Sequence, residues 1–321
     1  MLSEFELIRR FFTHPARGAV LGVGDDAALV RPAPGMEIAI STDMLVAGQH
    51  FFADMDPIRL GHKSLAVNLS DMAAMGATPR WVTLSLALPR ADAHWLAGFA
   101  RGFMRLARRH SVDLFGGDTT RGPLNICVQI MGEVPAGQAL RRDGARTADD
   151  VWVSGHLGDA ALAVAALKGR VRLDTRTRAQ VARRLDTPTA RIALGIALRG
   201  IANSAIDLSD GLVADLGHIC ERSKLAAQIE LERLPLSAVM RRFPEGAMKR
   251  SVLLAGGDDY ELCFTAPAKR APDVERAAQS AGVRVTRIGR MVTRPARGAL
   301  VTVLHRGKPL RIARGGYDHF R

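Results

Sequence analysis

Acidic residues recur after short apolar stretches in this chain. Ser41-Thr42-Asp43 follows the apolar run from Met36 to Ile40, and Asp71 lies further along in a mostly aliphatic segment. Two hydroxyls and a carboxylate at the end of a predicted strand can bind a hard cation such as Mg²⁺, which prefers oxygen ligands. Ser, Thr and Asp are also ordinary turn formers, so a plain turn is the alternative for this stretch taken alone.

The same pattern of an apolar run, small residues and one or two acids recurs downstream. The acids are Asp118, Asp207, Asp210, Asp258 and Asp259. In open α/β folds ligands bind at the carboxyl ends of strands, so acids that follow several strands can meet in one cleft. Carboxylates gathered there would repel one another unless metal ions lie between them. Asp210 has a competing interpretation as the N-cap of a helix that starts at Gly211, whose N-terminus would favour phosphate.

A flexible polar segment follows the predicted strand over residues 112–115. Gly116 to Gly122 combine two glycines with Asp118, two threonines and an arginine. Backbone amides and Thr hydroxyls can cradle a phosphate while Asp118 holds the metal that bridges it. A polar hairpin loop without a ligand is the alternative.

One predicted helix positions an acid in apolar surroundings. Asp56 as N-cap and Pro57 at the first helical position begin a helix that runs to Gly76. Asn68 and Asp71 are three residues apart and share one face of it. A carboxylate beside apolar neighbours is costly unless it is paired or binds a metal, so a purely structural interpretation explains Asp71 least well.

The remaining periodicity predicts an α/β chain of two domains. At 321 residues the chain exceeds what one core usually supports. Residues 135–150 are polar and rich in Arg, so we predict an N-terminal domain over residues 1–148 and a C-terminal α/β domain over residues 149–321. Further expected helices cover residues 5–12, 92–110, 158–168, 170–184 and 187–203, and further expected strands cover residues 81–88, 124–132, 151–153 and 262–264.

Composition narrows the class of protein. The net charge is +13, yet the arginines are dispersed as pairs and no nucleic-acid motif occurs, which favours a general attraction for phosphorylated metabolites over nucleic-acid binding. Cys127, Cys220 and Cys263 lack metal-ligand spacing and lie in apolar surroundings, as expected for buried thiols in a reducing compartment. No signal peptide or membrane-spanning run is visible, so we expect a cytoplasmic protein.

Seven blocks, in order along nearly the whole chain, resemble the motifs of the thiamine-monophosphate kinases, a family of the aminoimidazole ribonucleotide synthetase superfamily of ATP-binding proteins. The blocks lie at residues 24–26, 41–51, 66–76, 116–120, 205–212, 257–262 and 316–320. The resemblance implies that ATP and thiamine monophosphate give ADP and thiamine diphosphate. It also implies a two-domain aminoimidazole ribonucleotide synthetase-like fold and a homodimer whose N-terminal sheets form a β-barrel, with ATP near the dimer interface.

The resemblance also assigns residues to ligands. Several Mg²⁺ ions would be bound by Asp26, Ser41, Thr42, Asp43, Asp71, Asp118, Asp207 and Asp210. ATP would contact Gly117, Asp118, Arg142 and Ser209, and thiamine monophosphate would contact His50, Asp258 and Tyr317. The family commonly has Glu at the position of Asp258. Since the acceptor phosphate is already ionised, no general base is required, and we expect a direct in-line transfer without a phosphoenzyme.

Other reactions of the superfamily and one other class of protein are alternatives. A synthetase that activates an amide or carbonyl oxygen keeps the same ATP site. Selenophosphate-forming enzymes need a reactive Cys or selenocysteine near the N-terminus, and hydrogenase-maturation relatives use a C-terminal Cys; neither position has one here. A non-catalytic basic protein that binds nucleic acid or nucleotides is disfavoured because its acid clusters would repel phosphate without metal.

Overall fold

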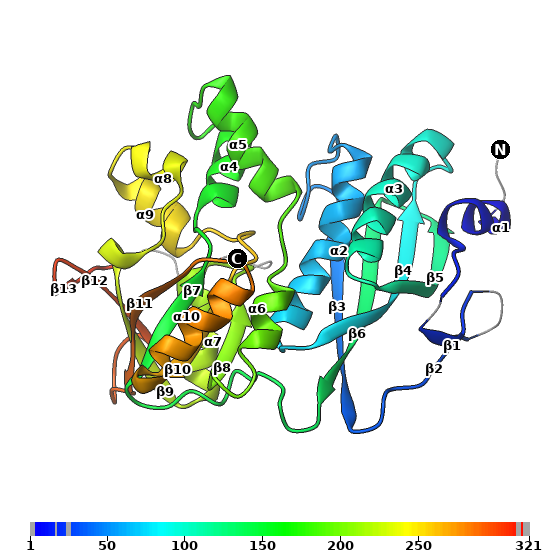
Figure 1. Cartoon of the computed structure of the whole chain (residues 1–321). Coiled ribbons are helices and arrows are strands. Elements are labelled where there is room, and N and C mark those ends of the chain that lie inside the picture. The colour runs from blue at the N-terminus through cyan, green and yellow to red at the C-terminus, as the bar shows by residue number, and fades with distance from the viewer. Residues whose placement is uncertain (1–3, 17, 24–26, 313–315, 317–321) are drawn as a thin grey trace. The chain divides into compact units, whose positions relative to one another are not determined.

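Two main β-sheets form the frame of the chain, one in each of its two structural units (Figure 1). The structure is a computed structural model that describes residues 4–16, 18–23, 27–312 and 316. The first unit consists of residues 1–72 and 77–137, and the second of residues 73–76 and 138–321. The predicted boundary between residues 148 and 149 stays a prediction.

The first unit contains a four-stranded sheet in the order β3-β6-β4-β5. Its members are β3 (Met36–Val46), β6 (Asn125–Pro135), β4 (Thr78–Leu88) and β5 (Asp113–Arg121). Strand β6 pairs antiparallel with both β3 and β4, whereas β4 and β5 are parallel. A parallel pair needs a crossover connection, and α3 (Ala93–Arg109) provides it. The other elements of this unit are α1 (Glu4–Leu7), the π-helix η1 (Ile8–Phe12), β1 (Ala19–Leu21), β2 (Leu29–Val30) and α2 (Pro57–Ala74).

Two strands are longer than predicted, and they include residues that we expected in loops. Ser41-Thr42-Asp43 lies in the middle of β3, because β3 pairs with β6 along all of its eleven residues. Residues 116–121 belong to β5 and pair with β4. The expectation that these acids follow the ends of strands is therefore wrong. Hydroxyl and acidic side chains in a strand alternate between its two faces, which a loop would not enforce.

The helix α2 begins where its predicted cap, Asp56, places it, and it packs closely against α3. Asp56 Oδ1 accepts hydrogen bonds from the backbone N–H groups of Ile58 (2.8 Å) and Arg59 (3.0 Å), and Asp92 caps α3 in the same manner. Figure 1 shows the two helices side by side on one face of the sheet. A Cβ atom added to Gly102 of α3 would lie 1.9 Å from the carbonyl oxygen of Ile58, so only glycine permits this approach.

The second unit contains a seven-stranded sheet in the order β13-β12-β9-β11-β7-β10-β8. Only the β12–β9 pair is parallel among the described strands of this sheet. Its strands are β7 (Asp149–Ser154), β8 (Ser204–Asp207), β9 (Leu225–Glu230), β10 (Leu262–Pro267), β11 (Val285–Thr293), β12 (Val301–His305) and β13 (Lys308–Pro309). Its helices are α4 (Asp159–Leu167), α5 (Thr175–Asp186), α6 (Ile192–Ala197), α7 (Leu212–Arg222), η2 (Leu231–Arg233), α8 (Ala238–Arg242), α9 (Ala247–Leu254), η3 (Ala268–Arg270) and α10 (Ala271–Ser280).

Two expectations for the second unit are wrong. The apolar run before Asp258 is the end of α9 and not a strand, because short apolar runs do not distinguish a strand from a buried helix. The helix predicted over residues 187–203 is limited to α6. Of the recurring acids in this unit, Asp207 does lie at the end of a strand, as the last residue of β8.

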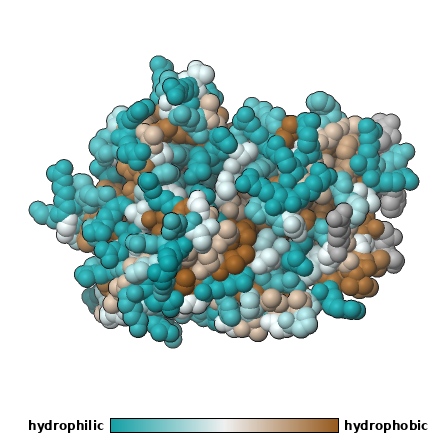
Figure 2. All heavy atoms as spheres, in the orientation of Figure 1, coloured by the Kyte–Doolittle hydropathy of each residue, from teal (hydrophilic) through white to brown (hydrophobic). Residues whose placement is uncertain are grey.

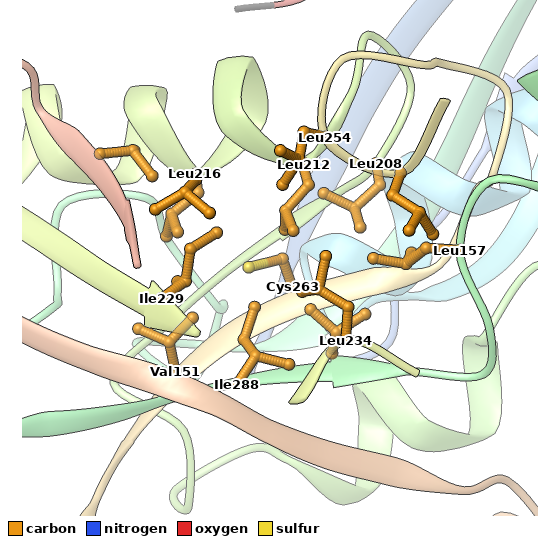
Figure 3. Packing of buried hydrophobic residues seen from close by; sticks show 14 of the residues in the cluster. Val151, Leu157, Leu208, Leu212, Leu216, Ile229, Leu234, Leu254, Cys263 and Ile288 are labelled. Atoms are coloured by element: carbon orange, nitrogen blue, oxygen red, sulfur yellow. The ribbon is translucent and has the colours of Figure 1, made fainter. Parts of the chain in front are cut away.

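The core of the second unit is mainly aliphatic, as expected for a chain in which only 5% of the residues are aromatic. Leu212, Leu216 and Ile229 lie in one cluster with Cys263 (Figure 3). Burial raises the pKa of the Cys220 thiol to about 12 and raises the pKa of Cys263 as well, so both thiols are neutral. The prediction of buried thiols is confirmed for these two cysteines, whereas Cys127 is partly exposed.

The surface is uneven in polarity. Figure 2 shows hydrophobic side chains over the hairpin of β1 and β2, where Val20 and Leu29 are 60% and 54% exposed. Within the described residues, no helix has the length and apolar character needed to cross a membrane.

Replacing Gly102 by Ala tests the close contact between α2 and α3. The added methyl group collides with the backbone of Ile58, so the helices must separate, and we expect a loss of about 1–3 kcal/mol in the free energy of unfolding by urea. The matched control is Arg101→Ala at an exposed position of the same helix, which should change it by less than about 0.5 kcal/mol. Equal effects of the two substitutions would contradict the packing described.

Candidate functional site

A hydroxyl and a carboxylate predicted to bind metal lie in contact in the first unit. Ser41 Oγ donates a hydrogen bond of 2.6 Å to Asp71 Oδ2 of α2. Ser41 pairs with the buried Ile130 of β6, so Ser41 points to the face of the sheet that α2 covers. Asp43 follows two residues later and shares that face. The structure therefore brings Ser41, Asp43 and Asp71 to the same face of the sheet.

Asn68 lies one turn before Asp71 and is completely buried. Its Nδ2 donates to the carbonyl oxygen of Ser64 at 3.0 Å, while its Oδ1 has no hydrogen-bond partner among the described residues. An unsatisfied buried acceptor costs about 1–3 kcal/mol, so Asn68 lowers the stability of the folded chain.

Asp118 lies on the opposite face of the same sheet. It pairs with Ser85, Ser85 pairs with Cys127, and Cys127 pairs with Met44, and paired residues share a face. Strand β5 is also three strand spacings, or about 14 Å, from β3. Thr42 alternates with Ser41 and Asp43 and therefore also lies on this outer face, where its Oγ1 accepts a 3.4 Å hydrogen bond from Gln129. One chain thus does not bring Asp118 and Thr42 to Asp71.

Gly117 allows β5 to pass close to β4. Its φ is 149°, and a Cβ atom there would lie 1.9 Å from the carbonyl oxygen of Leu84. Asp118 Oδ1 accepts from the N–H of Thr119 at 2.8 Å. The backbone at this predicted ATP contact is accordingly fixed by strand pairing and not by a flexible loop.

His50 closes a tight turn after β3. Its Nδ1 accepts from the N–H of Val46 at 3.0 Å, and its own N–H donates to the carbonyl oxygen of Val46 at 3.0 Å. An accepting Nδ1 carries no proton, so the neutral imidazole has its proton on Nε2. This orientation is fixed by the backbone before any ligand binds.

Two loops of the second unit are joined by backbone hydrogen bonds. The N–H of Asp258 donates to the carbonyl oxygen of Ser209 at 2.9 Å, and the N–H of Tyr260 donates to that of Leu208 at 2.8 Å. Asp258 and Tyr260 have φ values of 68° and 48°, a conformation that costs energy for residues other than glycine. The pairing brings Asp258 to the segment that contains Asp207, Ser209 and Asp210.

Asp215 organises the segment before α7. Its Oδ2 accepts hydrogen bonds from the backbone N–H groups of Ser209, Asp210 and Gly211 at 3.0, 3.1 and 3.0 Å. Burial, together with the charges of Asp207 and Asp210, raises the pKa of Asp215 to about 7. The N-cap position of α7 is Gly211, so the interpretation of Asp210 as N-cap is wrong, and the amides expected to favour phosphate bind the chain's own carboxylate.

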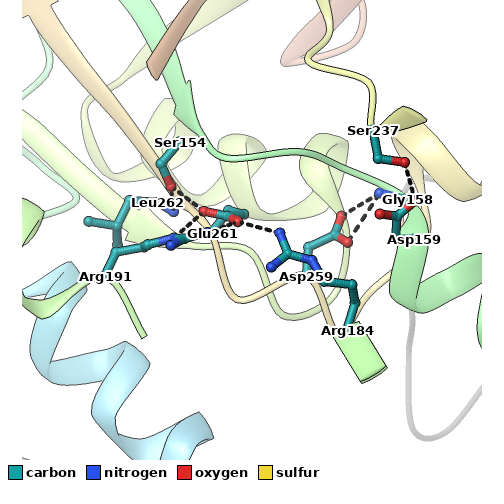
Figure 4. Close-up of polar contacts among 9 residues, drawn as sticks. All are labelled: Ser154, Gly158, Asp159, Arg184, Arg191, Ser237, Asp259, Glu261 and Leu262. Atoms are coloured by element: carbon teal, nitrogen blue, oxygen red, sulfur yellow. Dashed lines mark hydrogen bonds and ion pairs between the residues drawn. The ribbon is translucent and has the colours of Figure 1, made fainter. Parts of the chain in front are cut away.

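Glu261 anchors the loop that carries Asp258 (Figure 4). Its carboxylate is buried and receives both Nε (2.6 Å) and Nη2 of Arg191, Nη2 of Arg184 (3.2 Å) and Oγ of Ser154 (2.6 Å). Such bidentate arginine contacts fix both the position and the plane of a carboxylate. The same oxygen of Ser154 accepts from the N–H of Leu262 at 2.9 Å, which ties β7 to the start of β10.

Two more carboxylates lie beside this network. The N–H of Gly158 donates to both oxygens of Asp259, at 3.1 and 2.9 Å, and partial burial raises the pKa of Asp259 well above its ordinary value. Asp159 accepts from Ser237 Oγ at 2.7 Å, and burial also raises its pKa. Both side chains are visible in Figure 4.

The other predicted site residues are less closely associated. The carbonyl oxygen of Arg142 accepts from Ser223 Oγ at 2.8 Å, which places the backbone of Arg142 at the C-terminal end of α7, whereas Ser209 precedes its N-terminal end. Asp26 and Tyr317 lie outside the described residues. Throughout the described part of the chain, no three His, Cys, Asp or Glu side chains come together closely enough to form a metal site by themselves.

The sequence reasoning missed three residues that shape the site. Asp215 and Glu261 are 2% and 1% exposed, and Arg191 binds Glu261. The signal for Asp215 was an acid four residues after Gly211 in the first turn of an otherwise apolar helix. Arg191 had no local signal, because its partner is 70 residues away.

Comparison with known proteins identifies relatives over the whole chain. Residues 24–134 match the family described as AIR synthase related protein, N-terminal domain, and residues 148–301 match its C-terminal domain. The thiamine-monophosphate kinase of Escherichia coli is 44% identical over 322 residues, which are 99% of this chain and 98% of that protein.

Solved structures agree. The crystal structure of thiamine-monophosphate kinase from Stenotrophomonas maltophilia has a TM-score of 0.84 and 44% identity, covering 92% of this chain and 93% of that one. AaThiL complexed with AMPPCP and TMP has a TM-score of 0.78 and 31% identity, covering 90% and 89%. The chain thus has the two-domain α/β fold of these proteins.

Replacing Arg191 by Met tests the anchor of the Asp258 loop. The substitution removes the two contacts that Arg191 makes with the buried carboxylate of Glu261. We expect a loss of about 3–5 kcal/mol in the free energy of unfolding by urea. The control is Arg276→Met, which removes the exposed ion pair with Asp273 and should cost less than about 1 kcal/mol. A loss for Arg191→Met no larger than that of the control would show that the buried pair does not hold the loop.

Proposed function

The chain belongs to the AIR synthase related family and, within it, to the thiamine-monophosphate kinases, and from this premise we propose that it transfers the γ-phosphate of ATP to thiamine monophosphate in one in-line, Mg²⁺-dependent step. The products are ADP and thiamine diphosphate. The observation that carries the proposal is the 44% identity to a thiamine-monophosphate kinase across 99% of this chain. The relative complexed with AMPPCP, an analogue of ATP, and TMP supports the choice of both substrates.

The described donor groups fit Mg²⁺. Ser41, Asp43 and Asp71 in the first unit and Asp207 and Asp210 in the second offer only oxygen atoms, which Mg²⁺ prefers. A few protein ligands suffice, because Mg²⁺ keeps several waters and also binds phosphate oxygens. We assign Asp26, Thr42 and Asp118 to the same role. Bound Mg²⁺ would neutralise the charge that develops on the phosphates.

The residues of the chain position the substrates. We propose that Gly117, Asp118, Arg142 and Ser209 contact ATP and that His50, Asp258 and Tyr317 contact thiamine monophosphate. His50 and Asp258 are held by backbone hydrogen bonds in defined conformations, so little ordering is needed on binding. The acceptor phosphate is already ionised and requires no general base, so the reaction needs alignment and neutralisation of two polyanions.

We further propose that the chain forms a homodimer through the outer face of the first unit's sheet, so that two such sheets close into a β-barrel. Ile40 and Met44 of β3 are 60% and 55% exposed on this face. Large apolar side chains in such positions are typical of an interface. Since Asp118 and Thr42 lie on the same face, a second copy that covers this face would bring its own residues next to both of them, whereas Ser41 and Asp71 lie on the opposite face, under α2.

The activity is tested with purified protein, ATP, Mg²⁺ and thiamine monophosphate, with separation of the thiamine compounds by chromatography. Thiamine diphosphate should form from the monophosphate and not from free thiamine. Asp71→Asn removes a charge that faces Ser41 and should lower kcat/KM by about 100-fold or more. The matched control, Asp54→Asn at an exposed position, should leave kcat/KM unchanged. Equal activity of the parent and Asp71→Asn would refute the assigned role.

The dimer is tested by Met44→Glu, which introduces a charge into the proposed interface. The substitution should convert the dimer to a monomer in sedimentation velocity, because an unpaired charge is costly in an apolar contact. The control is Leu167→Glu, an equally drastic change at a position of the second unit that is 40% exposed. A parent protein that sediments as a monomer at all concentrations would rule out this part of the proposal.

A further inference from the structure

The segment before α7 contains a cluster of three backbone N–H groups that converge on one point. These are the N–H groups of Ser209, Asp210 and Gly211, and each donates to the same oxygen, Oδ2 of Asp215. Successive amides at the start of a helix are typical of a binding site for a phosphate oxygen. Here the anion that fills the cluster is part of the chain itself.

A filled amide cluster changes what the segment can do for a phosphate. ATP cannot bind these three N–H groups while Asp215 occupies them. The groups that the segment offers to a ligand are instead the carboxylates of Asp207 and Asp210, which repel phosphate unless a cation lies between. The geometry thus favours binding of the ATP phosphates through a cation over direct binding to the backbone N–H groups.

Stability alone does not account for a carboxylate at this position. Asp215 is 2% exposed and Asp207 is 6% exposed, and the charge of Asp207 opposes that of Asp215. Burial of like charges close together is unfavourable, and a neutral acceptor such as Asn would satisfy an N–H group without this repulsion. What the carboxylate adds is one oxygen acceptor strong enough to hold three consecutive amides.

The orientation fixed by Asp215 extends to the next loop. The carbonyl oxygens of Leu208 and Ser209 accept from Tyr260 and Asp258, so the conformation of residues 208–211 also sets that of the loop that carries Asp258. The carboxylate of Asp215 therefore constrains both residues 208–211 and the loop that carries Asp258.

We propose that Asp215 is a positioning residue for phosphoryl transfer, which keeps the amide cluster closed to phosphate and holds the carboxylates of Asp207 and Asp210 toward the cation. This inference rests on the proposed function. It assigns to Asp215 no contact with substrate, so its effects must appear in how the protein binds nucleotide with and without Mg²⁺.

The first test measures binding of ATP without Mg²⁺, by calorimetry in the presence of EDTA. The parent should bind ATP weakly, because its acids repel the phosphates. In Asp215→Ala the three amides are vacant and one negative charge is lost, so metal-free ATP should bind about tenfold more tightly or better. Loss of a merely structural residue would not produce this gain. Unchanged or weaker metal-free binding by a folded Asp215→Ala variant would overturn the proposal.

The second test measures turnover as a function of Mg²⁺ concentration. In Asp215→Asn, which keeps the size of the side chain, the Mg²⁺ concentration for half-maximal activity should rise by about tenfold or more and kcat should fall, whereas KM for thiamine monophosphate should change little. Glu221→Gln, an exposed acid on the same helix, is the control and should leave all three quantities unchanged. An Asp215→Asn variant with the parent's Mg²⁺ dependence would also overturn the proposal.

The two tests separate the inference from the proposed function. If the parent does not phosphorylate thiamine monophosphate, the proposed function fails, yet the metal-free titration still decides the role of Asp215 because it requires no turnover. Circular dichroism and thermal unfolding of each variant establish that it is folded before it is compared. If Asp215→Ala does not fold, Asp215→Asn is titrated in its place: its neutral amide removes the charge that repels phosphate and is a weaker competitor for the three N–H groups, so metal-free binding no tighter than the parent's contradicts the proposal.

Discussion

Compensation of buried negative charge is the constraint on which the second unit depends. Asp207, Asp215 and Glu261 are all buried, and each must be stabilised without leaving the interior. Glu261 has two arginines and a serine, and Asp215 has three backbone amides. Asp207 is the last residue of β8 and precedes the segment that Asp215 holds. The chain thus stabilises Asp215 and Glu261 with its own hydrogen-bond donors. The acids that we assign to Mg²⁺ or substrate are positioned by the backbone that these two residues hold.

In the first unit, polar side chains are divided between the two faces of one sheet. Alternation along β3 sends Ser41 and Asp43 toward α2 and sends Thr42 and Met44 to the outer face. A sheet with helices on one face only leaves its other face for a partner or for solvent. The apolar side chains on this outer face and the position of Asp118 are explained together if a second copy covers the face.

The sequence predicted those features that depend on local chemistry. The cap Asp56 defined the start of α2. The isolated acid Asp71 proved to contact Ser41, and the resemblance had assigned both residues to Mg²⁺. Strand lengths were underestimated in β3 and β5 because small and polar residues look like loops when the pairing partner is unknown. The second-unit network could not be predicted, since Glu261 and Arg191 are 70 residues apart and only tertiary packing brings them together.

Direct transfer between two bound polyanions, with every protein residue acting by position, is the central claim. It is tested most directly by the stereochemistry of the reaction, with ATP made chiral at the γ-phosphorus by oxygen isotopes and analysis of the thiamine diphosphate that forms. A single in-line step inverts the configuration at phosphorus, and the account predicts inversion. Retention would require two successive displacements and a phosphorylated residue of the protein, and would contradict the account.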